Sequence, residues 1–346
     1  MMRAYEIAPA FGLDQLRLVE RTTPEPGPFD VVVHVHAVSL NYRDLLVIEG
    51  VYHPKLALPR IVGSDGVGEV VAVGAHVRRV KVGDRVASAV LQGWTDGPLT
   101  ADAARTGLGG NLDGMLCEYA VLSEQGVVPV PAHLTDEEAA TLPCAGVTAW
   151  SALCDGPNGL DPVRPGETVV VQGTGGVSLF ALQFAKLAGA RVIVLSKSDA
   201  KLARARELGA DETINYVTTP DWDRAVRDLT GGLGADWVIE VGGAGTLPLS
   251  TRAVRHGGRI ALIGVLAAGH GSEFNPLPAM MKGVTIQGVF VGSRATFLRM
   301  NTAIACNELR PVVDEVFPFE AVGDALRLMK RGGHFGKLVV RIGGPA

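Results

Sequence analysis

The sequence Val169-Val-Val-Gln-Gly-Thr-Gly-Gly-Val-Ser178 decides how this chain folds. Its first residues are a short apolar run typical of a buried strand. The turn Gly173-Thr174-Gly175-Gly176 then leads into a helical apolar pattern that runs from Val177 to Ala188. The stretch therefore predicts a strand, a glycine turn and a helix in that order.

Each glycine of this turn has a mechanical role in that order. Gly173 permits the tight turn, and Gly175 lets the backbone approach a pyrophosphate. The helix that follows offers the free N–H groups of its first turn to the anion. Ser178 stands where such a site has its third glycine, which is a mild departure because a small residue still packs a helix on a strand. The pattern predicts a dinucleotide site, with the candidate cofactor-binding residues Gly173, Thr174, Gly175, Gly176 and Val177.

Strands and helices alternate on either side of this turn, from about residue 168 to 290. The predicted helices include Ala200–Leu208, closed by Gly209, and a helix from Asp221 to Leu229. The predicted strands are the apolar runs 169–172, 191–195, 212–215, 235–240, 258–263 and 284–290. This alternation indicates the α/β class, with a doubly wound parallel six-stranded sheet covered by helices.

The chain before residue 130 is different, because its short strands are separated by Gly and Pro. The predicted strands are 31–38, 68–73, 84–87 and 118–122. We expect 63–68 to be a turn-rich connection and 92–114 a long surface loop without its own core. Thr135 with Glu138 is a capping box that opens a helix. Near the C-terminus, we expect the helix 322–330 and the strand 337–342 to fold back on this β-rich domain.

Composition limits the partners and the compartment. The 346 residues, 47% of them apolar, supply enough material for two cores. The net charge is −4 and no basic tract occurs, so we expect no nucleic-acid partner. The four cysteines form no Cys-x-x-Cys pair, which favours a reducing compartment. No run of about 18 apolar residues occurs, so we expect a cytoplasmic protein without a membrane partner.

Several motifs together resemble the medium-chain dehydrogenase/reductase superfamily, and within it the zinc-independent, quinone-oxidoreductase-like members. The similarity runs nearly from end to end. The matching segments are Asn41-Tyr-Arg-Asp44, 63–74, 82–86, 142–150, the glycine turn, and Gly336-Lys337. The resemblance implies a GroES-like domain of residues 1–135, completed by 295–346, and a Rossmann domain of residues 136–294. It also implies a small-molecule substrate and a homodimer joined through the strand 284–290.

The resemblance also places the zinc ligands of the superfamily. Its zinc-dependent members have a cysteine at Asn41, a histidine at Ser64 and a third ligand at Cys144. Only Cys144 matches, and Zn²⁺ prefers thiolate, imidazole and carboxylate ligands. Residues 92–116 contain no cysteine for a structural zinc. We therefore expect no bound zinc, and Cys144 is interpreted most simply as a small buried hydrophobic residue.

Three polar residues are the catalytic candidates implied by the resemblance. Asn41 and Tyr52 match polar positions of the active site, and a phenol such as Tyr52 donates a hydrogen bond or a proton to a substrate oxygen. The alternatives are a turn-stabilising Asn and an amphipathic Tyr at a rim. Thr148 lies on a helix that approaches the nicotinamide in the family. Its alternative is an interior hydroxyl bonded to a carbonyl one turn back.

Further cofactor contacts are implied near the ends of the Rossmann strands and in the C-terminal segment. These candidates are Gly242, Gly264, Phe290, Val291 and Lys337. An interface strand is the alternative for the segment that begins at Phe290, and a solvated lysine is the alternative for Lys337. Asp65 and Glu69 match recurring acidic positions, and we expect them to pair with Arg85 in a structural role.

The end of the second Rossmann strand indicates which cofactor is preferred. A site for NAD(H) has an acidic residue about 20 residues after the glycine turn, where it bonds the ribose 2′-OH. This chain instead has Ser196, Lys197 and Ser198, with Lys201 and Arg204 following. Hydroxyls and cations suit a 2′-phosphate, so we expect NADP(H) to be preferred, with NAD(H) as the second choice. In the alternative, Ser198 or Asp199 caps the next helix while Lys201 and Arg204 face solvent.

The sequence thus predicts an NADPH-dependent oxidoreductase that transfers hydride to a small conjugated carbonyl acceptor, a quinone or an enone, without zinc. Two alternatives stay open. One is an NAD(P)-dependent alcohol dehydrogenase or carbonyl reductase of the same superfamily. The other is a dinucleotide-binding protein without turnover.

Overall fold

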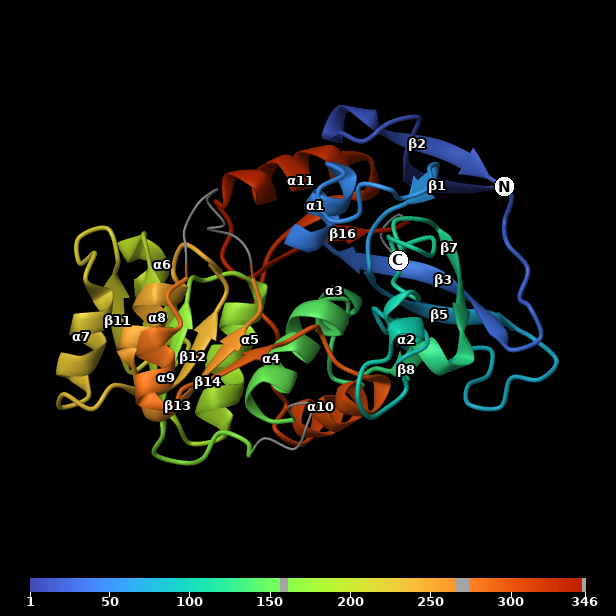
Figure 1. Ribbon diagram of the computed structural model, residues 1–346. Helices are drawn as coiled ribbons and strands as arrows, with labels where there is room; N and C mark the ends of the chain where they lie inside the picture. Colours follow the sequence, from blue (N-terminus) through green and yellow to red (C-terminus); the bar gives the residue numbers. More distant parts are fainter. Residues whose placement is uncertain (156–160, 265–273, 344–346) are drawn as a thin grey trace. The chain divides into compact units, whose positions relative to one another are not determined.

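The computed structural model describes residues 1–155, 161–264 and 274–343, and its contacts divide the chain into two compact units (Figure 1). The first unit comprises Met1–Val147 and Gly292–Ala346, and the second unit comprises Thr148–Val291. The domain boundaries given above stay a prediction. The two units are described separately below.

The second unit contains the expected parallel sheet of six strands. Its strand order is β11-β10-β9-β12-β13-β14, and every neighbouring pair is parallel. The strands are β9 (Thr168–Gln172), β10 (Arg191–Ser196), β11 (Glu212–Asn215), β12 (Ala235–Glu240), β13 (Val254–Leu262) and β14 (Thr285–Gly288). This is the doubly wound order of dinucleotide-binding folds, with β9 and β12 on either side of the point where the order reverses.

Helices connect these strands. Their bounds are α4 (Val147–Leu153), α5 (Gly176–Leu187), α6 (Asp199–Glu207), α7 (Trp222–Leu229), α8 (Leu247–Ala253) and α9 (Leu277–Lys282). The predicted termination of α6 by Gly209 is confirmed, because Gly209 has φ +100°. Two strands differ from the prediction, since β13 begins four residues before Gly258 and β14 ends at Gly288 rather than Phe290. All five residues of β9 are buried, as the valine run predicts for a strand covered on both faces.

The first unit is built on two sheets. The smaller sheet has the order β2-β1-β4, with strands β1 (Met2–Ile7), β2 (Leu16–Arg21) and β4 (Arg60–Ile61). The larger sheet follows the path β15-β16-β3-β5-β6-β8, and β7 also pairs with β3. Its strands are β3 (Asp30–Ser39), β5 (Asp65–Val73), β6 (Arg85–Ser88), β7 (Tyr119–Ser123), β8 (Val127–Pro129), β15 (Val313–Pro318) and β16 (Lys337–Arg341).

The C-terminal tail returns to the first sheet, as expected. Strand β16 pairs with β3 in antiparallel register, with Val340 opposite Val38. This pairing brings Lys337 to the end of β3, where Leu40 N–H donates to the carbonyl of Leu338. The helices of this unit are α1 (Tyr42–Ile48), α2 (Ala101–Ala104), α3 (Asp136–Ala139), α10 (Arg294–Cys306) and α11 (Val322–Arg331).

The capping box predicted at Thr135 and Glu138 is present at the start of α3. The helix is only four residues long, and a π-helical turn over Leu142–Gly146, with Pro143 at its start, follows it. This turn holds Cys144 against the start of β5, because Cys144 N–H donates to Asp65 Oδ2 at 3.1 Å.

Two expectations for the first unit were wrong. Residues 65–68 belong to strand β5 and not to a turn. Gly68 is a glycine because a Cβ there would lie 1.9 Å from the carbonyl oxygen of His34 on the paired strand. The segment 92–114 is not a coreless loop, since it contains α2 and buries Trp94 and Leu108.

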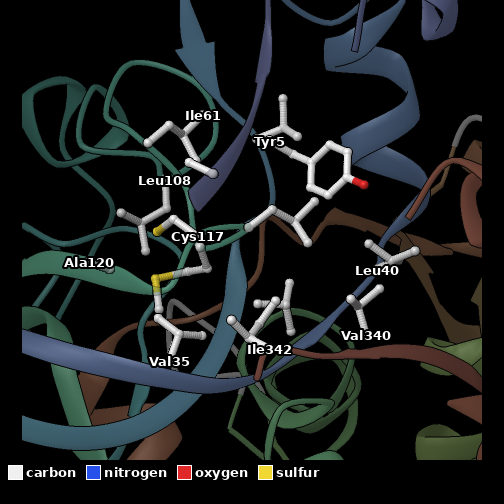
Figure 2. Packing of buried hydrophobic residues seen from close by; sticks show 14 of the residues in the cluster. Tyr5, Val35, Leu40, Ile61, Leu108, Cys117, Ala120, Val340 and Ile342 are labelled. Atoms are coloured by element: carbon white, nitrogen blue, oxygen red, sulfur yellow. The ribbon is translucent and has the colours of Figure 1, made fainter. Parts of the chain in front are cut away.

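Figure 2 shows Leu108 in the hydrophobic core of the first unit, together with Val35 of β3 and Val340 of β16. Cys117 lies in the same core, and burial raises the pKa of its thiol to about 12. The second unit has a separate core, in which Val170, Ile193 and Trp222 are buried. No helix within the described ranges is long and apolar enough to cross a bilayer.

Candidate functional site

A cluster of buried polar side chains lies where α1, β5 and β16 meet in the first unit. Asn41 is the residue before α1, and its N–H donates to Asp44 Oδ2 at 2.8 Å, which completes the first turn of the helix. Lys337 is the first residue of β16 and is only 4% exposed. Its Nζ donates to the Leu40 carbonyl at 2.6 Å and to Asn41 Oδ1 at 2.5 Å. The alternative of a solvated Lys337 is therefore wrong.

Ser64 and Asp65 extend this cluster at the start of β5. Ser64 Oγ donates to Asp65 Oδ1 at 2.8 Å, and Asn41 Nδ2 lies 3.4 Å from Ser64 Oγ. Burial raises the pKa of Asp65, and the Lys337 ammonium opposes that rise. The expected pairing of Asp65 and Glu69 with Arg85 is not what the structure shows, because Arg85 Nε donates to Asp136 Oδ1 at 2.6 Å.

Asp44 is a second buried carboxyl beside this cluster. Its Oδ2 accepts the Asn41 N–H, whereas its Oδ1 has no hydrogen-bond partner among the described residues. Burial raises the pKa of Asp44 to about 6, and the neighbouring guanidinium of Arg43 opposes the rise. Burial thus favours the neutral form of this carboxyl more than in an exposed aspartate.

Tyr52 follows the C-terminal end of α1, and its N–H donates to the Leu46 carbonyl at 3.0 Å. The guanidinium carbon of Arg43 is 5.0 Å from the centre of its ring, and Arg43 Nη1 donates to the Leu108 carbonyl at 3.0 Å. Tyr52 is 41% exposed. Arg43 therefore connects the exposed Tyr52 to the helix turn that begins at the buried Asn41.

A zinc ion does not fit the residues at the three predicted ligand positions. The carboxamide oxygen of Asn41 already accepts a hydrogen bond from an ammonium, and a second cation there would be repelled. The Ser64 hydroxyl donates to Asp65, and burial raises the pKa of the Cys144 thiol to about 12. Among the described residues, no three His, Cys, Asp or Glu side chains are grouped to hold a metal.

The glycine turn of the second unit has the shape that a pyrophosphate site requires. Gly173 has φ +73°, which favours glycine, and its N–H donates to the Leu195 carbonyl at 2.7 Å. Gly175 has φ −81°, and a Cβ there would meet no atom within 4 Å. Neither backbone strain nor packing requires a glycine at 175, and the space in front of it is open. Thr174 and Gly176 complete the turn, and α5 begins at Gly176, ahead of Val177.

Ser178 takes the place of the third glycine without disturbing the turn. Its hydroxyl donates to the Gln172 carbonyl at 2.7 Å, and the side chain is buried. At positions 242 and 264, packing explains why the residue is a glycine. A Cβ at Gly242 would lie 2.2 Å from Thr246 Oγ1, and one at Gly264 would lie 2.0 Å from the Val241 carbonyl oxygen.

The segment Ser196–Ser198 lies beside the glycine turn, because Ser196 ends β10, the neighbour of β9. Lys197 is exposed, and Ser196 is buried with its Oγ 3.3 Å from the Ser198 N–H. Ser198 also caps α6, since its Oγ accepts the Lys201 N–H at 3.4 Å. The capping alternative thus applies to Ser198. Of the cations, Lys197 beside the turn and Arg204 farther along α6 are exposed, and Lys201 is half-buried.

The other predicted residues of the second unit differ in their surroundings. Thr148 is 4% exposed, and its hydroxyl forms no hydrogen bond within the described parts of the chain, so the bond one turn back is not observed. Phe290 is 46% exposed. Val291 has φ +52°, a conformation that costs free energy for a β-branched residue and often occurs at functional sites.

Sequence reasoning missed one buried residue of this unit. Glu240, the last residue of β12, is 0% exposed and accepts hydrogen bonds from both sides of its carboxylate. The signal was present, because a charged residue follows the apolar run 237–239 at the sheet edge where ligands bind.

Comparison with known proteins agrees with this arrangement. Residues 27–132 match the family model of the alcohol dehydrogenase GroES-like domain, and residues 176–305 match that of the zinc-binding dehydrogenases. A zinc-type alcohol dehydrogenase-like protein of Schizosaccharomyces pombe is 43% identical, over 96% of both chains. The chain belongs to the medium-chain dehydrogenase/reductase superfamily.

Solved structures of this superfamily match nearly the whole chain. An NAD-dependent alcohol dehydrogenase has a TM-score of 0.88 at 38% identity, covering 99% of this chain and 100% of its own. A mycobacterial protein solved in complex with NADPH has a TM-score of 0.82 at 26% identity, with the same coverage. A chain of this superfamily is an oxidoreductase whose fold binds a nicotinamide dinucleotide.

Proposed function

We propose that this protein is a zinc-independent, NADPH-dependent oxidoreductase that reduces a small conjugated carbonyl compound, a quinone or an enone. The observation that carries the proposal is the Lys337 ammonium on the Asn41 carboxamide. The Lys337 ammonium supplies a cation, and the Asn41 amide supplies an oriented donor, at the place where zinc-dependent relatives hold their metal.

The Lys337 contact determines how the Asn41 amide is turned. An ammonium only donates, so the atom that faces it must be Oδ1, and Nδ2 points away. Nδ2 lies 3.4 Å from Ser64 Oγ, and the Asn41 side chain also makes a hydrogen bond that lowers the pKa of Asp65. Because the Ser64 contact is long, we assign the hydrogen that points toward Ser64 as the donor to the substrate oxygen.

Conjugation replaces the metal as the source of electrophilic activation. A reduced nicotinamide, when bound, would supply a hydride for the β-carbon or ring of the acceptor. The electron pair of the carbon–carbon double bond then moves toward oxygen, where Asn41 Nδ2 stabilises the charge and Tyr52 delivers a proton. Thr148, whose hydroxyl has no hydrogen-bond partner among the described residues, would order the nicotinamide ribose, and the backbone at Phe290 and Val291 would contact the nicotinamide.

The cofactor is bound by the second unit. The turn from Gly173 to Val177 holds the pyrophosphate, and Gly242 and Gly264 lie at neighbouring strand ends. Lys197, with the hydroxyls of Ser196 and Ser198, takes the 2′-phosphate of NADP(H), and Lys201 adds positive charge at the start of α6. Asp199 Oδ1 already accepts a hydrogen bond from Asn215 Nδ2 at 2.8 Å.

A second candidate function is alcohol dehydrogenation or carbonyl reduction with NAD(H). It is supported by the names of the similar alcohol dehydrogenases, one of which is described as NAD-dependent. The residues at the metal positions favour the conjugated acceptor, because a simple alcohol needs a Lewis acid or a strong base at its oxygen.

The catalytic assignment is tested with Asn41→Ala and Tyr52→Phe. Each removes one donor to the developing charge, so turnover should fall roughly tenfold to a thousandfold while the dissociation constant of NADPH stays nearly unchanged. Tyr42→Phe is the matched control, because Tyr42 is also 41% exposed and is adjacent to Asn41 in sequence. Wild-type turnover in both Asn41→Ala and Tyr52→Phe would refute the assignment.

The cofactor assignment is tested by the dissociation constants of NADPH and NADH for the wild type and for Lys197→Ala. We expect tighter binding of NADPH in the wild type and a selective loss of that preference in the variant. Lys186→Ala is the control, because Lys186 pairs with Asp211 at the far end of α5. Equal affinities for both cofactors that Lys197→Ala leaves unchanged would remove the argument.

A further inference from the structure

Glu240 is a buried carboxylate at the sheet edge where the cofactor is expected. It ends β12, which pairs with β9, and Gln172 ends β9 directly before the glycine turn. Both side chains are buried, Glu240 completely and Gln172 to 6% exposure. In parallel sheets of this kind, ligands bind outside the carboxyl ends of the strands, at the point where the strand order reverses. Glu240 and Gln172 lie on the two strands that flank this point.

Every hydrogen-bond partner of the Glu240 carboxylate is a donor in the observed arrangement. Oε1 accepts from the N–H groups of Gly242 and Gly243, at 2.8 and 2.9 Å, and from Thr246 Oγ1 at 2.5 Å. Oε2 accepts from Gln172 Nε2 at 2.8 Å and from Ser250 Oγ. A carboxylate buried in this way is stable only when its oxygens accept hydrogen bonds. These five donors supply those hydrogen bonds.

Gln172 connects the same segment to the glycine turn. Its Nε2 also donates to Ser250 Oγ at 2.8 Å, while its Oε1 accepts the N–H groups of Val241 and Gly242 at 3.3 Å each. The segment 241–246 is therefore held on one side by Glu240 and on the other by Gln172. The backbone that leads into Gly173 and the backbone of Gly242 share one hydrogen-bond network.

We propose that Glu240 is a positioning residue of the dinucleotide site, which acts through Gln172 and the N–H groups of 242–243 on the two loops that contact the cofactor. This inference rests on the cofactor site proposed above. It assigns no contact between Glu240 and the cofactor, because the carboxylate is completely buried by the protein.

The network predicts what an isosteric substitution does. In Glu240→Gln, one oxygen becomes an NH₂ donor that faces the N–H groups of Gly242 and Gly243 or the NH₂ of Gln172. If the Gln172 amide turned over to accept that donor, its own NH₂ would face the Val241 and Gly242 N–H groups. At least one buried donor thus loses its acceptor in any arrangement, and the two loops must shift.

The exchange Gln172→Glu with Glu240→Gln reverses the polarity of the pair and restores every contact. Glu at 172 accepts the N–H groups of Val241 and Gly242 and the new amide of residue 240. Gln at 240 keeps an oxygen on Gly242 and Gly243. The double variant should therefore bind cofactor nearly as well as the wild type, although each single variant does not.

The test is a fluorescence titration of the full-length protein with NADPH and NADH. Glu240→Gln should raise the dissociation constant about tenfold or more, and the double variant should return it to within about threefold of wild type. The turnover number at saturating cofactor should change little, so the effect appears in KM for the cofactor. Asp236→Asn is the control, because Asp236 binds Thr168 and Arg255 at the opposite end of β12.

The outcomes separate this inference from the cofactor site itself. If the wild type binds neither cofactor, the proposed cofactor site is wrong and the role of Glu240 falls with it. If the wild type binds and Glu240→Gln binds equally well, only the positioning role is overturned. The same holds if Asp236→Asn weakens binding as much as Glu240→Gln does. If Glu240→Gln does not fold, Ser250→Ala removes one shared hydroxyl, and an unchanged affinity in that variant overturns the inference.

Discussion

Replacement of Lys337 by Met tests the buried cation on which the active-site proposal depends. The substitution keeps an unbranched side chain of similar length and removes the ammonium. The acceptors Leu40 O and Asn41 Oδ1 then lose their charged donor in a site where Lys337 is 4% exposed. An unsatisfied buried acceptor costs about 1–3 kcal/mol, and a broken buried charge interaction costs about 3–5 kcal/mol. We therefore expect the free energy of unfolding to fall by about 3 kcal/mol.

The same change should reduce turnover, because nothing then holds the Asn41 amide with Nδ2 turned toward the substrate. A loss of roughly tenfold to a hundredfold is expected for one misplaced donor. Urea unfolding and steady-state kinetics measure the two effects. Lys186→Met is the control, since the half-exposed Lys186–Asp211 pair should contribute no more than about 1 kcal/mol. Equal stability and equal turnover in Lys337→Met and Lys186→Met would refute the reasoning.

The cost of Lys337→Met should also depend on pH. Burial raises the pKa of Asp65 and Lys337 opposes this rise, so the variant has a still higher Asp65 pKa. A carboxyl whose pKa is raised in the folded chain favours folding at acid pH, and it loses this contribution as the pH rises through its folded-state pKa. The stability difference between the variant and the wild type should therefore be larger at pH 8 than at pH 5. A difference that is independent of pH would show that Lys337 and Asp65 do not interact.

Three further predictions follow from single features. Burial raises the pKa of Asp44 to about 6, so Asp44→Asn should be more stable than wild type by about 1–3 kcal/mol at pH 7. This stability difference should shrink as the pH falls toward 4. A difference in urea unfolding that does not depend on pH would contradict this prediction. The hydrogen bond to Asp136 raises the pKa of His36. The free energy that this pair contributes to folding is therefore complete below the ordinary His pKa and is lost as the pH rises through the raised pKa of His36. An NMR titration of His36 that Asp136→Asn leaves unchanged would disprove this. The strand β14 has one neighbour in its sheet, and dimerisation through it predicts a light-scattering mass of about twice 36.2 kDa, which the mass of a single chain would contradict.

The parts of the fold that short-range patterns determine could be predicted from the sequence. The predicted bounds of β11, β12 and α7 agree with the observed ones within a residue, because the pattern of a buried strand or an amphipathic helix lies in consecutive residues. The start of β5 was misread, because glycine indicates a turn unless the close approach of a partner strand is known. Gly68 needs its missing Cβ for the His34 carbonyl, a contact that the sequence does not reveal.

The candidate site could be predicted only in part, because some of its contacts join residues that are far apart in the sequence. The motif around Asn41 and the position of Lys337 could be recognised, but the bond between them joins residues 296 positions apart. Whether Lys337 is solvated or buried depends on the pairing of β16 with β3, which no local pattern encodes. The role of Glu240 was missed because its donors come from β9, α8 and its own loop, and only the assembled sheet brings them together.

The central claim is hydride transfer to a conjugated carbonyl without a metal, and one measurement tests it most directly. Purified, untagged protein is analysed for zinc and then assayed for NADPH oxidation with a quinone and an enone, and for NADP⁺ reduction with a primary alcohol. We predict far less than one zinc per chain, turnover of the conjugated acceptors that survives treatment with a chelator, and slow alcohol oxidation. Near-stoichiometric zinc that is lost together with activity on chelation would contradict the account, as would efficient alcohol oxidation by a protein that ignores quinones and enones.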